Sequence, residues 1–127
     1  MRRFRFIEWQ VYKDAKELFP ILLTVVKKLP KEYRYEIGSQ IIRAGLSIVL
    51  NIAEGSGKHS DAELNRFFDI ALGSLFEVFA AVDVLHDSTM VDGEHFQEIE
   101  RLSVAISDQL GGFKKSIRSA RNSVIQL

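Results

Sequence analysis

Residues 36–55 read EIGSQIIRAGLSIVLNIAEG, a stretch in which apolar side chains cover most of a helix surface and leave one narrow polar seam. At 100° per residue, the polar positions recur at intervals of three and four residues and fall within an arc of roughly 80°. The seam consists of Gln40, Arg43, Ser47, Asn51 and Glu54. A helix that is apolar over the rest of its surface normally has neighbours on several sides. The stretch therefore predicts the central helix of an all-α domain.

Helical patterns also precede and follow this stretch. Residues 8–29 carry an apolar stripe at three- and four-residue spacing, in which Pro20 is expected to kink the helix. Pro30 should end that helix, and residues 31–35 should form a short connection. At the far end of the central helix, Gly55 and Gly57 can take the left-handed conformation that commonly terminates helices.

Two more helices are expected beyond residue 60. Ser60 and Glu63 match a capping box, which predicts a helix over residues 61–86, and Asp92 is a suitable N-cap for a last helix that passes through Gly111 and Gly112. Four helices with short loops predict an all-α, antiparallel, up-down-up-down four-helix bundle. We expect a single domain over residues 1–127, with disorder, if anywhere, at residues 1–7 and 120–127.

The composition excludes several classes of protein. The absence of cysteine excludes a disulfide scaffold, a thiolate zinc site and a cysteine nucleophile. No uncharged apolar run approaches the 18–20 residues or so that a membrane span requires, and the N-terminus lacks the apolar core of a signal peptide. We therefore expect a cytoplasmic protein that does not contact a membrane. Seventeen basic and seventeen acidic residues cancel, which argues against nucleic-acid binding through bulk charge.

The charges are nevertheless unevenly distributed. Residues 1–35 contain nine Lys and Arg against four Asp and Glu, whereas residues 36–92 contain three against nine. The basic residues of the first helix and of the last are therefore candidates for binding RNA, with ordinary solvated charge as the alternative. These candidates are Lys13, Lys16, Lys27, Lys28, Lys31, Arg34, Lys114, Lys115, Arg118 and Arg121.

The polar seam and the apolar surplus predict two kinds of contact. We expect the seam to face Arg66, Ser74 and Glu77 in an interhelical network that fixes register, since buried polar groups need partners. The alternative is a binding groove with Glu54 and Glu77 as paired carboxylates.

Leu72, Phe76 and Phe79 widen the apolar arc of residues 61–86 beyond what one core needs. They therefore predict an interface between copies of the chain.

Catalytic, cofactor and metal sites are not expected. Residues 55–60 (GSGKHS) superficially match a phosphate-binding loop, but its first glycine is missing and a helix rather than a strand precedes it. Asp83 with His86, and Asp92 with His95, have a spacing used in di-iron bundles, yet both pairs flank one loop and lie far from Glu54. A metal-binding bundle is thus a remote alternative. We expect no enzyme, no cofactor and no small-molecule substrate.

Several short motifs support a family resemblance. They are residues 40–44 (QIIRA), 47–48 (SI), 51–55 (NIAEG) and 73–77 (GSLFE), together with Leu29-Pro30 before the central helix. In this order they resemble the bacterial four-helix-bundle family of 23S rRNA intervening-sequence proteins. The resemblance implies a non-catalytic protein that associates with ribosomal RNA or another ribonucleoprotein and forms a homo-oligomeric ring, apparently a pentamer. The residues themselves leave a protein-only adaptor or oligomeric scaffold open.

Overall fold

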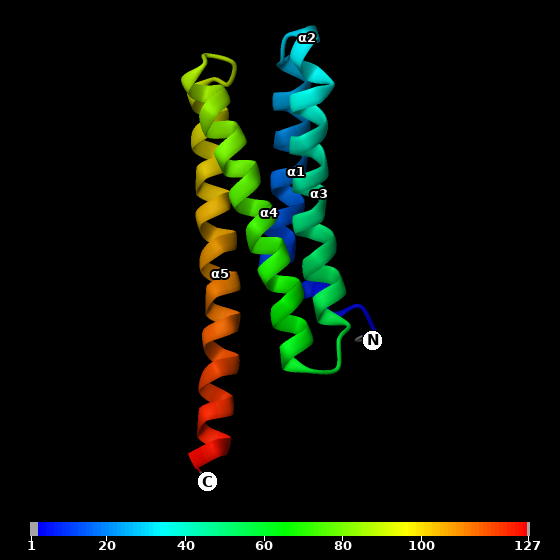
Figure 1. Ribbon diagram of the computed structural model, residues 1–127, viewed down its shortest axis with the longest axis vertical. Helices are drawn as coiled ribbons and strands as arrows, with labels where there is room; N and C mark the ends of the chain where they lie inside the picture. The colour runs from blue at the N-terminus through cyan, green and yellow to red at the C-terminus, as the bar shows by residue number, and fades with distance from the viewer. Residues whose placement is uncertain (1–2, 127) are drawn as a thin grey trace.

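The computed structural model describes residues 3–126, with side chains through residue 113, and the described chain is helical apart from its connections (Figure 1). The elements are η1 (Arg5–Glu8), α1 (Gln10–Lys28), α2 (Lys31–Arg34), α3 (Glu36–Ser56), α4 (Asp61–Asp87) and α5 (Gly93–Gln126). No strand occurs within residues 3–126. The all-α prediction is therefore confirmed.

Each of the four long helices packs against two of the others. α1 packs against α3 and α5, and α4 packs against the same two helices. The connections from α1 to α3 and from α4 to α5 lie at one end of the molecule, and the connection from α3 to α4 lies at the other (Figure 1). Because α3 also contacts α2 and η1, the prediction that residues 36–55 have neighbours on several sides is confirmed.

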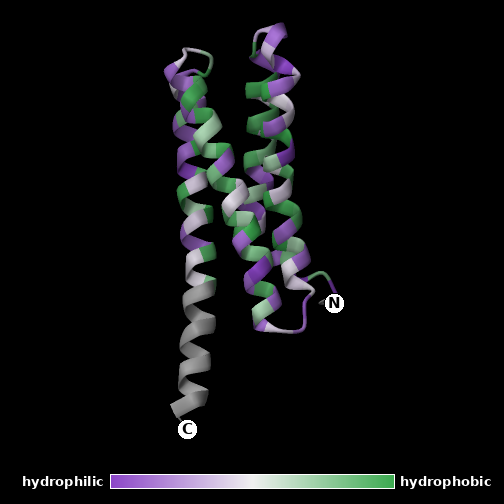
Figure 2. Cartoon of the chain, in the orientation of Figure 1, coloured by the Kyte–Doolittle hydropathy of each residue, from purple (hydrophilic) through white to green (hydrophobic). Residues whose placement is uncertain are grey.

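One apolar core runs between these helices, and all four long helices contribute to it. Hydrophobic and hydrophilic residues alternate along each of them, as expected for amphipathic helices (Figure 2). The largest fully buried side chains are Leu18, Leu22, Leu29, Ile41, Ile48, Ile52, Phe68, Leu75, Ile99, Leu102, Ile106 and Leu110. The three- and four-residue spacing of apolar residues in the sequence thus identifies most of the core correctly.

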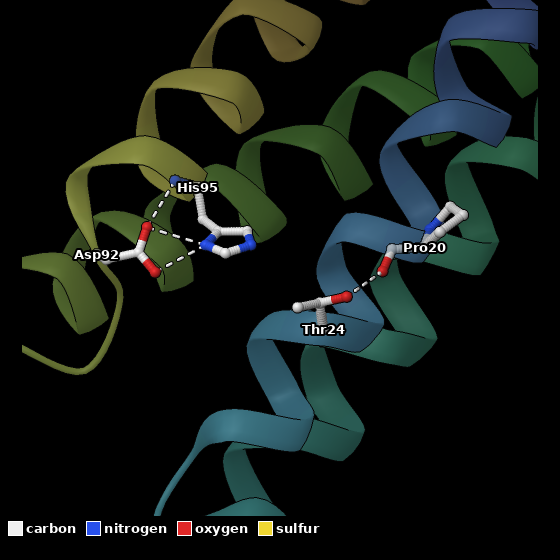
Figure 3. A network of polar contacts seen from close by, with 4 residues as sticks. All are labelled: Pro20, Thr24, Asp92 and His95. Carbon is white, nitrogen blue, oxygen red and sulfur yellow. Dashed lines mark hydrogen bonds and ion pairs between the residues drawn. The ribbon is translucent and has the colours of Figure 1, made fainter.

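Some predicted boundaries are wrong by a few residues. The first helix starts at Gln10, not at Glu8, because Trp9 has an extended backbone and Glu8 belongs to the short helix η1. Residues 31–34, expected as a plain connection, form one helical turn, α2. Pro20 lies inside the continuous helix α1, where the hydroxyl of Thr24 donates to its carbonyl at 3.2 Å (Figure 3). The expected disorder at residues 120–127 stays a prediction.

The predicted N-terminal caps of α4 and α5 are present, but the predicted C-terminal cap of α3 is not. The Ser60 hydroxyl accepts from the Glu63 amide at 3.2 Å, which confirms the first half of the capping box. No described glycine has a positive φ, so the left-handed terminus predicted for α3 is wrong. Gly57 has φ −91°, and its amide donates to the Glu54 carbonyl at 3.1 Å, which tightens the last turn instead.

α1 and α3 approach each other closely at two buried glycines. A methyl group at Gly38 would lie 2.6 Å from Cγ1 of Val26, and one at Gly45 would lie 2.7 Å from Cδ1 of Leu22. Both distances are far shorter than the 3.5–4.0 Å or so that separates carbon atoms in contact. The two glycines therefore set the spacing of these helices.

We predict that Gly38→Ala destabilises the protein. Overpacking against the stiff, branched side chain of Val26 should cost about 1–3 kcal/mol, of which the better helix propensity of alanine recovers up to about 1 kcal/mol. Gly111→Ala, inside α5, is the matched control, because nothing lies within 4 Å of its added methyl group. That control should gain about 0.5–1 kcal/mol.

Denaturant unfolding of both variants at one protein concentration measures the two free energies. Equal shifts of the unfolding midpoint in both variants would contradict the close approach of α1 and α3.

Candidate functional site

The centre of the polar seam is a hydrogen-bonded link between α3 and α4. The hydroxyls of Ser47 and Ser74 lie 2.9 Å apart. The amide nitrogen of Asn51 donates to the Ser47 carbonyl at 2.8 Å and to the Ser47 hydroxyl at 3.0 Å. All three side chains are partly buried. This part of the seam therefore links the two helices by hydrogen bonds, and its role in fixing their register stays a prediction.

The outer positions of the seam do not join that network. The side chains concerned are Gln40, Arg43, Glu54, Arg66 and Glu77, and all of them are exposed. The burial expected for this set is therefore wrong. The seam lies at the rim of the α3–α4 contact, where short serine and asparagine side chains fit between the helices and longer ones extend into solvent. A binding role for the exposed members stays a prediction.

The described basic candidates fall into two groups along α1 and α2. Lys13 and Lys16 are exposed near the start of α1, and the ammonium of Lys16 lies 5.6 Å from the ring centre of Tyr12. The second group, which we call the α1–α2 cationic end, consists of Lys27, Lys28, Lys31 and Arg34, all exposed. One of these cations also has a structural role, since the Arg34 guanidinium donates to the Leu29 carbonyl at 3.0 Å and caps α1.

The basic candidates of the last helix lie outside the described side chains. They are Lys114, Lys115, Arg118 and Arg121. The segment starts at the end of the molecule opposite the α1–α2 cationic end, because the ring of Phe113 packs 5.1 Å from both Trp9 and Phe68. A single basic surface formed by the first and last helices stays a prediction.

Cations near η1 and the start of α4 are a feature that the sequence reasoning missed. The guanidinium of Arg5 lies 5.3 Å from the ring of Trp9. Lys58 and Arg66 both lie within 5 Å of the ring centre of Phe67, at 4.9 and 4.8 Å. Only the fold could reveal this grouping, because η1 and α4 are far apart in sequence.

Two of the three residues predicted at an interface between copies line a groove between α4 and α5. Phe76 and Phe79 lie in it, whereas Leu72 is partly buried against the core. The groove has a volume of about 550 Å³. Its other lining residues are Leu75, Ala80, Asp83, Glu100, Ser103, Val104, Ser107 and Asp108.

The Asp-x-x-His spacings have structural explanations. Asp92 caps α5 by accepting from the His95 amide at 2.8 Å and from its ring Nδ1 at 2.7 Å (Figure 3). These backbone and side-chain hydrogen bonds from His95 lower the pKa of Asp92. The His86 ring stacks on Phe96 with centres 4.2 Å apart. Within the described residues, no group of three His, Cys, Asp or Glu could hold a metal ion.

A buried carboxylate between α1 and α5 was also missed by the sequence reasoning. Asp14 is only 9% exposed and accepts from Gln10 at 2.8 Å and from Gln109 at 2.7 Å. The contact with Gln10 could be predicted from the sequence, because Gln10 lies one turn earlier in the same helix. The contact with Gln109 could not, because that residue is 95 positions away. Its two amide partners make Asp14 a register contact between α1 and α5.

Comparisons with known proteins agree with this architecture. The sequence model of the 23S rRNA-intervening sequence protein family matches residues 8–112. A solved structure of a protein of unknown function, from the S23 ribosomal protein family of Bacteroides thetaiotaomicron, aligns with a TM-score of 0.72 and 25% sequence identity. The alignment covers 79% of this chain and 94% of that one. No sequence among curated proteins matches the chain. Separately, none of the helices described is long and apolar enough to cross a membrane.

We predict that Asn51→Ala lowers the free energy of unfolding by about 0.5–1.5 kcal/mol, because it removes the hydrogen bonds to Ser47. Glu54→Ala is the control on the same face of α3. Since Glu54 is exposed, its replacement should change stability by less than about 0.5 kcal/mol. Thermal and denaturant melts measure both, and equal losses would show that the outer seam is as structural as its centre.

Proposed function

The chain belongs to the 23S rRNA-intervening sequence protein family, and on that premise we propose that it is a non-catalytic, homo-oligomeric protein of the cytoplasm that associates with ribosomal RNA or another ribonucleoprotein. The proposal contains no catalytic residue, cofactor, metal or small-molecule substrate. The observation that carries it is the α1–α2 cationic end, where four basic side chains are exposed within eight residues of sequence. Phosphate oxygens are the natural partners of such a cluster.

The charges around this cluster favour an anionic partner. Glu32 is the one acidic residue between residues 27 and 34, and Asp92 lies close enough to Lys28 for that cation to contribute to its lowered pKa. The stretch therefore carries four cations against one acid. A single copy would make few phosphate contacts and bind weakly, but repetition of the cluster in an oligomer would raise the overall affinity through effective concentration.

The finer architecture is also part of the proposal. The packing of α1 on α3, α3 on α4, α4 on α5 and α5 on α1 forms a closed circuit. Together with connections at alternating ends, this circuit supports an antiparallel, up-down-up-down four-helix bundle (Figure 1). We propose that copies of this bundle assemble into a ring, a pentamer by the family resemblance. The exposed apolar side chains of α3 and α4, among them Leu46, Leu50, Ile70 and Phe76, support the assembly.

A protein-only scaffold is the second candidate, and one observation favours it. The groove between α4 and α5 combines apolar residues with three carboxylates, at Asp83, Glu100 and Asp108. Such a surface suits a protein segment and repels nucleic acid.

The RNA proposal predicts salt-dependent binding that depends on the α1–α2 cationic end. For wild type, the logarithm of the association constant for RNA should fall with the logarithm of salt concentration by about 0.7–0.9 per phosphate contacted. Lys27→Ala, Lys28→Ala and Lys31→Ala combined should weaken binding and lower that slope by up to about 2–3. Arg34 is left unchanged because it caps α1. Titration of a ribosomal RNA fragment at two salt concentrations measures both quantities.

The matched control removes three cations elsewhere on the surface, with Arg43→Ala, Lys58→Ala and Arg66→Ala. All three are exposed, so net charge changes equally while the α1–α2 cationic end is kept. Equal weakening in both triple variants would mean that bulk charge alone attracts RNA. Absence of binding by wild type at low salt would favour the protein-only scaffold.

A further inference from the structure

The groove between α4 and α5 is a hollowed surface that the proposed RNA contacts do not use. Its apolar part includes Phe76, which is 64% exposed, and Val104, which is 55% exposed. Large apolar side chains exposed next to each other on a hollowed surface usually mark an interaction site. The lining residues come from α4 at 75–83 and from α5 at 100–108.

The rim of the groove carries charge of one sign. Asp83, Glu100 and Asp108 are exposed, and none of the described residues that line the groove is basic. Arg101, the basic residue next to Glu100, instead lies 3.9 Å from Glu17 of α1. The groove therefore favours a cationic occupant with an apolar face, and it repels RNA and anionic lipid.

One residue of the groove lining carries a buried hydroxyl. Ser103 is 6% exposed, lines the groove, and its hydroxyl has no hydrogen-bond partner among the described residues. Buried polar atoms without a partner are rare in native structures, and each calls for an explanation. The oxygen is almost completely covered, so an occupant reaches it only if neighbouring side chains move, and the charged rim is the stronger indication of what binds here.

The chain itself contains a segment of the required chemistry. Residues 114–126 read KKSIRSARNSVIQ and contain four cations and no acid. On a helix, the apolar positions 117, 120 and 124 recur at spacings of three and four residues and share one face. Those seven steps span about 10 Å, comparable to the roughly 12 Å that eight steps of α4 or α5 provide along the groove.

This segment can reach such a groove only in another copy. α5 is one continuous helix from Gly93 to Gln126 and extends beyond the ends of the other long helices (Figure 1). It therefore leads the segment away from the groove that its own residues 100–108 help to form. A contact between two different surfaces of identical chains is heterologous, and it closes into a ring when the rotation between copies permits.

We propose that the basic C-terminal segment, residues 114–126, docks in the acidic α4–α5 groove of a second copy of the chain. The proposal rests on the proposed homo-oligomer and specifies its contact. It assigns Lys114, Lys115, Arg118 and Arg121 to a neighbouring copy rather than to RNA. Their positive charge complements Asp83, Glu100 and Asp108, while the apolar face of the segment covers Phe76 and Val104.

Disulfide mapping tests this contact directly, because the chain has no native cysteine. Full-length Val104→Cys and Ile117→Cys chains are purified separately, mixed, and equilibrated in a thiol–disulfide buffer. We expect the mixed disulfide dimer in several-fold excess over the dimer formed by Val104→Cys with Thr24→Cys. Thr24 is an exposed control position on α1. Equal yields from the two mixtures would overturn the proposal, whatever the oligomeric state.

A charge exchange tests the electrostatic part of the proposal. Glu100→Lys with Asp108→Lys, or Lys114→Glu with Arg118→Glu, should each raise the dissociation constant of the oligomer about tenfold or more, measured by light scattering across a dilution series. Combining the four substitutions in one chain should restore assembly. Circular dichroism checks that each variant is folded.

The outcomes separate this inference from the function proposed above. A wild-type mass of one chain at micromolar concentration would contradict the homo-oligomer and the docking together, and leave RNA binding to be judged by its own titration. A stable wild-type oligomer whose mass is unchanged by either charge reversal would overturn the docking alone. In that case the groove would be left for a basic segment of a different protein.

Discussion

The close approach of α1 and α3 at Gly38 and Gly45 is the constraint on which the rest of the structure depends. With no side chain between the helix axes at these positions, Val26 and Leu22 pack directly on the backbone of α3. That contact fixes the rotation of α3 about its own axis. Ile41, Ile48 and Ile52 then face the core, and the rotation places Ser47 and Asn51 at the rim toward α4. Leu46 and Leu50 are left facing outward.

The sequence predicts the core well because burial follows helical periodicity. In the apolar arc of residues 61–86, Phe68, Leu75 and Leu85 are buried, since a helix with one apolar face has few ways to hide it. Helical periodicity shows which face of a helix a residue lies on, but not how far it lies from the centre of the contact with the next helix. For this reason the sequence wrongly predicts that Glu54 joins a buried network. Contacts such as Asp14 with Gln109 depend on the pairing of α1 with α5, which no local pattern encodes.

The candidate surfaces were less predictable than the core for a related reason. The acids at 83, 100 and 108 are ordinary solvated residues in the sequence and form a rim only when α4 and α5 lie together. The same applies to Arg5, Lys58 and Arg66, which the fold places beside aromatic rings. A chain with no net charge can therefore carry local surfaces of opposite sign. This separation allows self-association through one surface and anion binding through another.

Gly73 lies on the same face of α4 as two residues that line the groove. It lies in the middle of α4, and nothing lies within 4 Å of the place that an added methyl group would take, so its own chain gives no packing reason for a glycine there. An interior helix glycine costs about 1 kcal/mol relative to alanine. Steps of three and four residues lead from Gly73 to Phe76 and Ala80, which line the groove, so the three residues share one face of α4. A small residue at the edge of an apolar groove lets another backbone approach closely. Docking of a second copy would account for a glycine that the isolated chain does not need.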